Sequence, residues 1–168
     1  FRKEDVGQPK TMALSNILRD LTGRETNPVP DKVNSQNIFH GVVVAMVDSM
    51  KARKEIFAAC RYDAGVSYYI DARSGGDSAL VYSLDPRDPD CVRRYEESIY
   101  DDDFASPAPC ATSRQVPTLF LIAAAIGELL ARREEHELKI GEFVRVIIGI
   151  DRNGLPSITS EAYTGFSF

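Results

Sequence analysis

The feature that most constrains the fold is a run of apolar, mostly β-branched residues that ends at an acidic residue. Residues 41–47 read Gly-Val-Val-Val-Ala-Met-Val and are followed directly by Asp48. A continuous apolar run of this length predicts a buried strand of a parallel sheet. In open α/β sheets, ligands lie outside the carboxyl ends of the strands. The sequence therefore predicts an α/β domain with Asp48 at its ligand-binding edge.

Helical and strand patterns alternate along the rest of the chain. Apolar spacing, Pro9 in the first turn and a stop at Gly23 predict the first helix, and two β-rich runs predict neighbouring strands. The tail has the alternation and turn residues of a hairpin. We expect a mixed sheet flanked by helices. The predicted helices cover residues 9–23, 50–62 and 115–133, and the predicted strands cover residues 41–47, 66–73, 79–83, 143–150 and 155–159.

Two regions leave alternatives open. Residues 85–110 hold four prolines and an acidic run at Asp101–Asp103, which predicts a crossover loop around a short helix near residues 92–98. The helix over residues 115–133 is apolar around nearly its whole circumference, which indicates burial on both sides. Either the sheet and neighbouring helices or a subunit interface would provide that burial. The length of 168 residues predicts one domain spanning residues 1–168.

Composition and charge exclude several classes of function. The net charge of -5 and a pI near 5.1 argue against a nucleic-acid partner. No apolar stretch free of charges is long enough to cross a bilayer, and the N-terminus lacks the pattern of a signal peptide, so the expected compartment is the cytoplasm. The three cysteines form no C-x-x-C pair, so no zinc is expected.

Four short motifs carry the functional prediction. Asp5–Lys10 reads Asp-Val-Gly-Gln-Pro-Lys and places Lys10 at the opening of a helix. Asp48–Arg53 follows the buried strand, and Arg73-Ser74-Gly75-Gly76 follows the next one. Cys110 precedes the long hydrophobic helix. A lysine and an acid directed at one crevice can serve a nucleoside triphosphate and its magnesium ion.

In this order, the four motifs resemble the ThiF/MoeB/HesA family of ubiquitin-activating-like enzymes. The family's "D-V-G-x-P-K" matches Asp5–Lys10, and its "D-N-x-x-x-R" matches Asp48–Arg53 with Ser49 in place of asparagine. The resemblance implies the C-terminal part of a Rossmann-like adenylation fold. It also implies ATP-dependent adenylation of the C-terminal carboxylate of a ubiquitin-like or sulfur-carrier protein, by an enzyme that forms a homodimer.

The resemblance also implies roles for individual residues. Lys10, Ser49 and Arg73 would bind the nucleotide, Asp48 would hold its Mg²⁺, and Arg53 would be a catalytic group that reaches phosphate. From the residues alone, each has a plainer interpretation: Lys10 as a solvated lysine, Asp48 as a helix N-cap, and Arg53 as a surface arginine or a partner of Asp48. Both interpretations stay open for each residue.

Thioester-forming members of this family use a nucleophilic cysteine. Cys91 lies in the predicted loop beside Arg93 and Arg94, which would lower its pKa, and beside Asp88 and Asp90, which would oppose that effect. Cys110 matches a family position that is usually structural. Each is an alternative nucleophile, and each has the plainer interpretation of a cysteine without chemistry. Cys60 falls on the apolar face of a helix and is predicted to lie in the core.

The chain also departs from the family pattern. No G-x-G-x-x-G or G-x-x-x-x-G-K-[ST] phosphate loop occurs in it, so we expect the sequence to be a fragment that lacks the Gly-rich nucleotide-binding half. This departure keeps an alternative function open. The chain would then be a non-catalytic module, degenerate or one half of a heterodimer, that binds a ubiquitin-like protein.

Overall fold

The computed structural model describes residues 1–75, 77–101, 115–135 and 141–164. The chain separates into two compact units, Phe1–Val33 and Asn34–Phe168, where the sequence predicts a single domain. The elements in chain order are η1 (Lys3–Asp5), α1 (Lys10–Thr22), β1 (Gly41–Ala45), α2 (Met50–Cys60), β2 (Val66–Ser74), β3 (Ser78–Leu84), α3 (Pro89–Glu97), α4 (Gln115–Glu134), β4 (Glu142–Ile150) and β5 (Pro156–Thr164).

The first unit consists of a short 3-10 turn and helix α1. This helix ends at Gly23, as predicted, because Gly23 adopts a left-handed φ of 69° and donates its N–H to the Arg19 carbonyl oxygen at 2.8 Å. Ala13 is buried, whereas Leu14, Leu18 and Leu21 are exposed. The predicted apolar stripe of α1 is therefore present, with Ile17 half-buried and its three leucines exposed.

The second unit is built on a five-stranded sheet in the order β1-β2-β3-β4-β5. Strand β1 pairs with β2 in parallel, and α2 connects the two strands. The three other pairings are antiparallel, so the sheet is mixed. The predicted C-terminal hairpin is confirmed as β4 and β5. Its turn is closed by the Asp151 carboxylate, which accepts from the N–H groups of Asn153 and Leu155.

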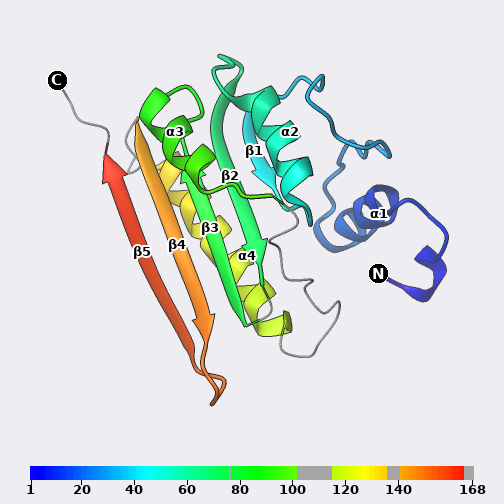
Figure 1. Cartoon of the computed structure of the whole chain (residues 1–168). Coiled ribbons are helices and arrows are strands. Elements are labelled where there is room, and N and C mark those ends of the chain that lie inside the picture. Colours follow the sequence, from blue (N-terminus) through cyan, green and yellow to red (C-terminus); the bar gives the residue numbers. More distant parts are fainter. Residues whose placement is uncertain (76, 102–114, 136–140, 165–168) are drawn as a thin grey trace. The chain divides into compact units, whose positions relative to one another are not determined.

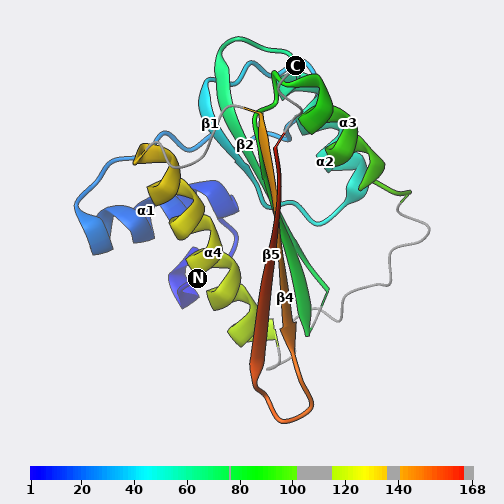
Figure 2. The ribbon, with the colours of Figure 1, turned by 90° about the vertical axis from the view of Figure 1, so that its left-hand side faces the viewer.

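Helices cover both faces of this sheet. Figure 2 shows α2 and α3 on one side of the strands and α4 on the other. The same arrangement is seen from the front in Figure 1, where α2 and α3 lie before the sheet and α4 lies behind it. The second unit is therefore a three-layer α/β fold with one parallel and three antiparallel strand pairs.

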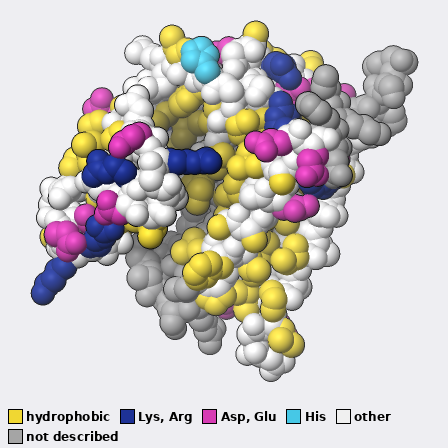
Figure 3. Space-filling view, turned by 180° about the vertical axis from the view of Figure 1, so that it is seen from behind, with side chains coloured by type: hydrophobic (Ala, Val, Ile, Leu, Met, Phe, Trp, Pro, Cys, Tyr) yellow, Lys and Arg dark blue, Asp and Glu magenta, His cyan; other side chains and the backbone are white. Residues whose placement is uncertain are grey.

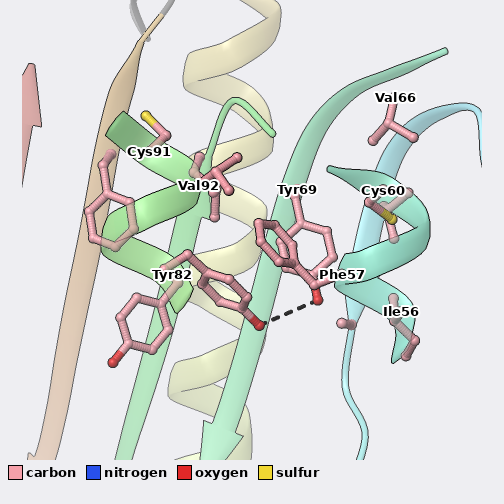
Figure 4. Close-up of a cluster of buried hydrophobic side chains, with 13 residues drawn as sticks. Ile56, Phe57, Cys60, Val66, Tyr69, Tyr82, Cys91 and Val92 are labelled. Carbon is pink, nitrogen blue, oxygen red and sulfur yellow. Dashed lines mark hydrogen bonds between the residues drawn. The ribbon is translucent and has the colours of Figure 1, made fainter. Parts of the chain in front are cut away.

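Each face of the sheet has its own core, because successive residues of a strand point to opposite faces. Under α2 and α3 the core is aromatic, and Figure 4 shows Phe57, Tyr69 and Tyr82 within it. Under α4 it is aliphatic, with Ile70, Ile122 and Leu129 among its buried residues. Strand β2 contributes to both cores, and this explains why the middle of its sequence lacks polar alternation.

Helix α4 is buried on one side only. Ile122 and Leu129 pack against the sheet, while Leu119 and Phe120 are 50% and 74% exposed. Figure 3 views this face of the molecule and shows hydrophobic side chains gathered on its surface. The sheet thus buries one face of this helix. The predicted alternative of a subunit interface applies to the opposite, exposed face.

The fold class is confirmed at the level of an α/β protein with a mixed sheet flanked by helices. Two local predictions are wrong. Strand β1 is predicted to be buried, but it is an edge strand of the sheet with Val42 and Val44 exposed. Cys91 lies in the first turn of α3 rather than in a loop. Of the interpretations left open for Arg53, the surface arginine is excluded, because Arg53 is buried. Among the helices of the described residues, none has the length and apolar character required to traverse a bilayer.

Candidate functional site

Asp48 lies just beyond the carboxyl end of β1, three residues after Ala45, the last residue of that strand. Its side chain is exposed, and within the described part of the chain it has no hydrogen-bond or ion-pair partner. Strand β1 is parallel to β2, so this is the edge at which α/β sheets place their ligands. Asp48 therefore presents an unpaired carboxylate to solvent at that edge.

Ser49, and not Asp48, is the N-cap of helix α2. The Ser49 hydroxyl oxygen accepts from the Ala52 backbone N–H at 3.1 Å, and the Ser49 backbone is extended, as an N-cap requires. This excludes the plainer interpretation of Asp48 as the capping residue. It also gives Ser49 a structural role of its own, since its oxygen is engaged in the cap.

Arg53 lies one turn into α2, where it forms a buried ion pair with Asp71 of β2. Its Nη1 donates to Asp71 Oδ1 at 2.9 Å, and its Nη2 donates to the Ala72 carbonyl oxygen at 3.0 Å. Arg53 is 5% exposed and Asp71 is 0% exposed. The partner of Arg53 is therefore Asp71, not Asp48 as one interpretation predicted.

Arg73 binds the same carboxylate from the other side. Its Nε donates to Asp71 Oδ2 at 2.7 Å, and its two terminal nitrogens donate to the carbonyl and hydroxyl oxygens of Ser98. The guanidinium also lies over the Tyr82 ring, 4.4 Å from its centroid. Arg73 thus joins β2 to the end of α3.

The Arg53–Asp71–Arg73 cluster is held together by charge in a poorly solvated place. Burial would lower the pKa of Arg73, but the Asp71 carboxylate outweighs it, and the net effect raises that pKa. Arg73 is therefore charged at neutral pH. With two arginines on one carboxylate, the cluster carries a net positive charge. Its direct effect is structural, since it fixes the first turns of α2, and with them Asp48, against β2.

The two described cysteines are buried in the aromatic core, where Figure 4 labels both. Cys91 is 1% exposed. Burial, followed by the nearby Asp88 carboxylate, raises the pKa of Cys91 to about 12. The predicted neighbours do not lower it: Arg93 pairs with Asp90 and Glu97, and Arg94 lies over the Tyr163 ring. In this fold Cys91 is a protonated, inaccessible thiol. Cys60 has a similar environment, and its pKa is also raised to about 12 by burial.

The remaining predicted site residues are distributed as follows. Lys10 is the first residue of α1 in the first unit, and its side chain is exposed. Gly76 and Cys110 lie outside the described residues, so the structure places neither. The structure therefore brings together Arg53 and Arg73 from the predicted set, and it places Asp48 and Ser49 directly ahead of the helix that carries Arg53.

Sequence reasoning missed Asp71, the residue that organises this cluster. A signal for it was present, because Asp71 and Arg73 are two positions apart in a strand and must share one face. A charged pair on the same face as Tyr69 predicts an ionic interaction within the core. This spacing was overlooked because the residues that precede Asp71 in the strand are mostly apolar.

Asp48 could bind a magnesium ion only if other groups, such as the phosphates of a substrate, completed the coordination of the ion. The described residues contain no group of three or more His, Cys, Asp or Glu side chains that could hold a metal ion. Mg²⁺ is commonly bound by one or two carboxylates, with substrate phosphates and waters completing its octahedron. Asp48 fits that pattern, because its carboxylate is exposed and unpaired.

The fold and the position of Asp48 together define an α/β protein with an acidic residue just after the carboxyl end of a parallel strand. No protein-family model matches the chain, and no curated protein sequence matches it.

Proposed function

We propose that this chain contributes the magnesium-binding part of an ATP-dependent adenylation site for the C-terminal carboxylate of a ubiquitin-like or sulfur-carrier protein. The observation that carries the proposal is Asp48, a solvent-facing carboxylate at the ligand edge of the sheet. Ser49, rather than Asp48, caps α2, and among the described residues no cation pairs with the Asp48 carboxylate. A carboxylate left without a structural partner is available for a ligand.

In the proposed reaction, a carrier carboxylate oxygen attacks the α-phosphorus of ATP. The bond from that phosphorus to the bridging oxygen breaks, and pyrophosphate leaves. Bound Mg²⁺ would neutralise the charge that develops on the departing phosphates. Asp48 would hold the ion in place. Lys10 belongs to the first unit, and its proposed role as a positive charge at the phosphates rests on the family resemblance alone. No cysteine takes part in this step.

Arg53 and Arg73 take positioning roles in this proposal. All four of the contacts that Arg73 makes to Asp71, Ser98 and Tyr82 are internal. Arg53 likewise donates to Asp71 and to the β2 backbone. Together they hold the start of α2 on the sheet and therefore set where Asp48 points.

A second candidate function is a non-catalytic module that binds the same kind of carrier. The absence of a Gly-rich phosphate loop from the 168 residues favours this candidate, because such loops supply the backbone N–H groups that cradle phosphates. An adenylating enzyme would need that cradle from outside these residues. The two candidates differ in whether nucleotide is used at all.

The test is ATP-pyrophosphate exchange by the full protein. The substrates are Mg·ATP, labelled pyrophosphate and purified ubiquitin-fold proteins of the same organism that end in glycine. We expect exchange that depends on one of these carriers and falls at least about tenfold in Asp48→Asn and Lys10→Ala. Asp90→Asn and Lys32→Ala are matched controls, since both residues are exposed and lie outside the proposed site.

Two outcomes would redirect the proposal. Carrier binding without exchange, unaffected by Asp48→Asn, would support the non-catalytic module. Exchange that is equal in wild type and Asp48→Asn would remove Asp48 from the site while leaving the activity in place.

A further inference from the structure

A pocket of about 200 Å³, here called the Arg94 pocket, opens between the C-terminal half of α3 and strands β3, β4 and β5. Its apolar wall consists of three aromatic rings, Tyr82, Phe143 and Tyr163. Its polar groups are supplied by Arg94, Glu97, Ser98 and Arg145. All of these residues belong to the second unit, and none of them is among the residues predicted to bind nucleotide.

Arg94 is the distinctive residue of this pocket. Its side chain is half-buried, and its guanidinium lies over the Tyr163 ring, 4.6 Å from the centroid. That stacking occupies the face of the guanidinium and leaves the N–H groups on its edge. Among the described residues Arg94 makes no ion pair or hydrogen bond. Its in-plane donors are therefore available to an acceptor in the pocket.

The other charged groups of the pocket are already paired. Arg145 donates from Nε to Glu161 Oε2 at 3.0 Å, and the Tyr163 hydroxyl donates to the same oxygen at 2.9 Å. Glu97, which also lines the pocket, accepts from Arg93 at 3.2 Å. Among the charged residues that line the pocket, Arg94 is therefore the one that forms no ion pair with a described residue.

The charge beneath the pocket has the same sign. Arg73 stacks on Tyr82 and donates to Ser98, two residues that line the pocket, and it belongs to the buried cluster that carries a net positive charge. The pocket lining also contains one carboxylate, that of Glu97, which is exposed and paired with Arg93 and is therefore screened by solvent and salt. The interior side of the pocket is therefore positive.

A second pocket provides a comparison, because each basic side chain that lines it forms an ion pair. It has about 330 Å³ and an apolar floor that includes Phe57 and Ile99, between α2 and α3. Its two basic residues both have partners, Lys54 with Asp101 and Arg61 with Glu96. That pocket offers no unpaired charge to a ligand, whereas the Arg94 pocket does.

From these observations we propose that the Arg94 pocket is a binding site for a carboxylate carried on a small flat or apolar body. The carboxylate would form the two-pronged pair with the Arg94 guanidinium, and the body would contact the three rings. The volume lies below the 300–1,000 Å³ of sites for drug-sized ligands, and this favours a small ligand. The pocket meets the C-terminal end of α3, whose dipole is negative; this opposes any anion, and it opposes a doubly charged phosphate more than a singly charged carboxylate, whose attraction to Arg94 must exceed it.

The proposal is tested by titrating the ¹⁵N-labelled protein with sodium benzoate, inorganic phosphate and a short acetylated, amidated peptide that contains one aspartate. We expect saturable shifts of the Ser98, Phe143 and Tyr163 amide signals with benzoate, with the peptide, or with both. Saturation by benzoate indicates a free carboxylate ligand, and saturation by the peptide alone indicates an acidic side chain of a partner protein. Either result supports a carboxylate site.

Variants identify the anchoring group. Arg94→Gln should weaken binding of the saturating ligand by roughly tenfold or more, because it removes the charge-assisted pair. Arg94→Lys keeps the charge and should weaken binding less. Arg152→Gln is the control, since Arg152 is exposed in the turn between β4 and β5 and does not line the pocket, and it should leave binding unchanged. The unperturbed amide spectrum of each variant establishes that it is folded.

Three results would overturn the proposal. These are linear, unsaturable shifts with every carboxylate, tighter binding of phosphate than of either carboxylate ligand, or an equal affinity in Arg94→Gln and wild type. None of them depends on Mg·ATP, so this site and the proposed adenylation function stand or fall separately.

Discussion

Two aspartates on neighbouring strands of this sheet have opposite environments. Asp71 lies within β2, is completely buried, and has an arginine on each of its carboxylate oxygens. Asp48 follows β1, is exposed, and has no partner among the described residues. Ala45 pairs with Asp71, so Asp48 lies only three residues past the same level of the sheet.

The difference shows how burial assigns a role to a carboxylate. A buried carboxylate is stable only when it is paired with positive charge, and removing the Asp71 carboxylate leaves the two arginines that face it buried without a counterion. An exposed carboxylate contributes little to stability and is free to bind a cation from solution. We therefore expect Asp71 to act on folding and Asp48 to act on ligand binding.

The largest effect is expected for Asp71→Asn. The variant leaves Arg53 and Arg73 buried without a counterion, which should lower the free energy of unfolding by about 3–5 kcal/mol. Urea denaturation monitored by circular dichroism measures it. Asp48→Asn, the comparison variant, should stay within about 0.5 kcal/mol of wild type. Similar losses in the two variants would mean that the difference in burial has no energetic consequence.

A smaller loss is expected for Arg53→Met. Asp71 keeps Arg73 as a partner in this variant, so the free energy of unfolding should fall by about 2 kcal/mol. A double-mutant cycle with Asp71→Asn should give a coupling energy of at least about 0.5 kcal/mol. Additive effects of the two substitutions would argue against a shared network.

The buried thiols predict a dependence of stability on alkaline pH. Burial raises the pKa of Cys60 and Cys91 from 9.0 to about 12, so above pH 9 the unfolded thiols lose protons that the folded ones keep. Unfolding then releases protons, and the free energy of unfolding decreases as the pH rises from 9 toward 12. Urea midpoints at several pH values measure this slope, which should be shallower in Cys91→Ala. An unchanged slope in that variant would contradict the assignment.

The smallest effect is expected at the exposed ion pairs. Arg93→Gln removes the pairs with Asp90 and Glu97, whose side chains are all exposed, so the free energy of unfolding should change by less than about 0.5 kcal/mol. Thermal unfolding in low and high salt provides the measurement. A loss comparable to that of Arg53→Met would show that exposure does not separate the two kinds of arginine.

Local patterns were sufficient to predict most of the sheet. The apolar run at residues 41–47, the β-rich runs and the C-terminal hairpin all correspond to strands, because strand composition and turn residues are local signals. The apolar run did not reveal that β1 is an edge strand with Val42 and Val44 exposed, because strand order is not a local property. The stop of α1 at Gly23 follows equally from one residue. What sequence could not provide was the partner of each charged side chain.

Arg53 and Cys91 illustrate that limit. Helical spacing placed Arg53 on α2, but only the register of β2 shows that Asp71 faces it. Two arginines near Cys91 in sequence predicted a low pKa, yet both point elsewhere and the thiol is buried. Asp71 was only partly hidden: its contact with Arg53 spans 18 residues along the chain, whereas its contact with Arg73 spans two and could have been predicted from strand spacing.

The most direct test of the account is the magnesium dependence of ATP binding by the full protein, in wild type and in Asp48→Asn. We predict that Mg²⁺ strengthens ATP binding in wild type and that this gain is lost in Asp48→Asn, while its free energy of unfolding is unchanged. The same gain from Mg²⁺ in both proteins would contradict the assignment of Asp48 as the ligand-binding carboxylate of this sheet.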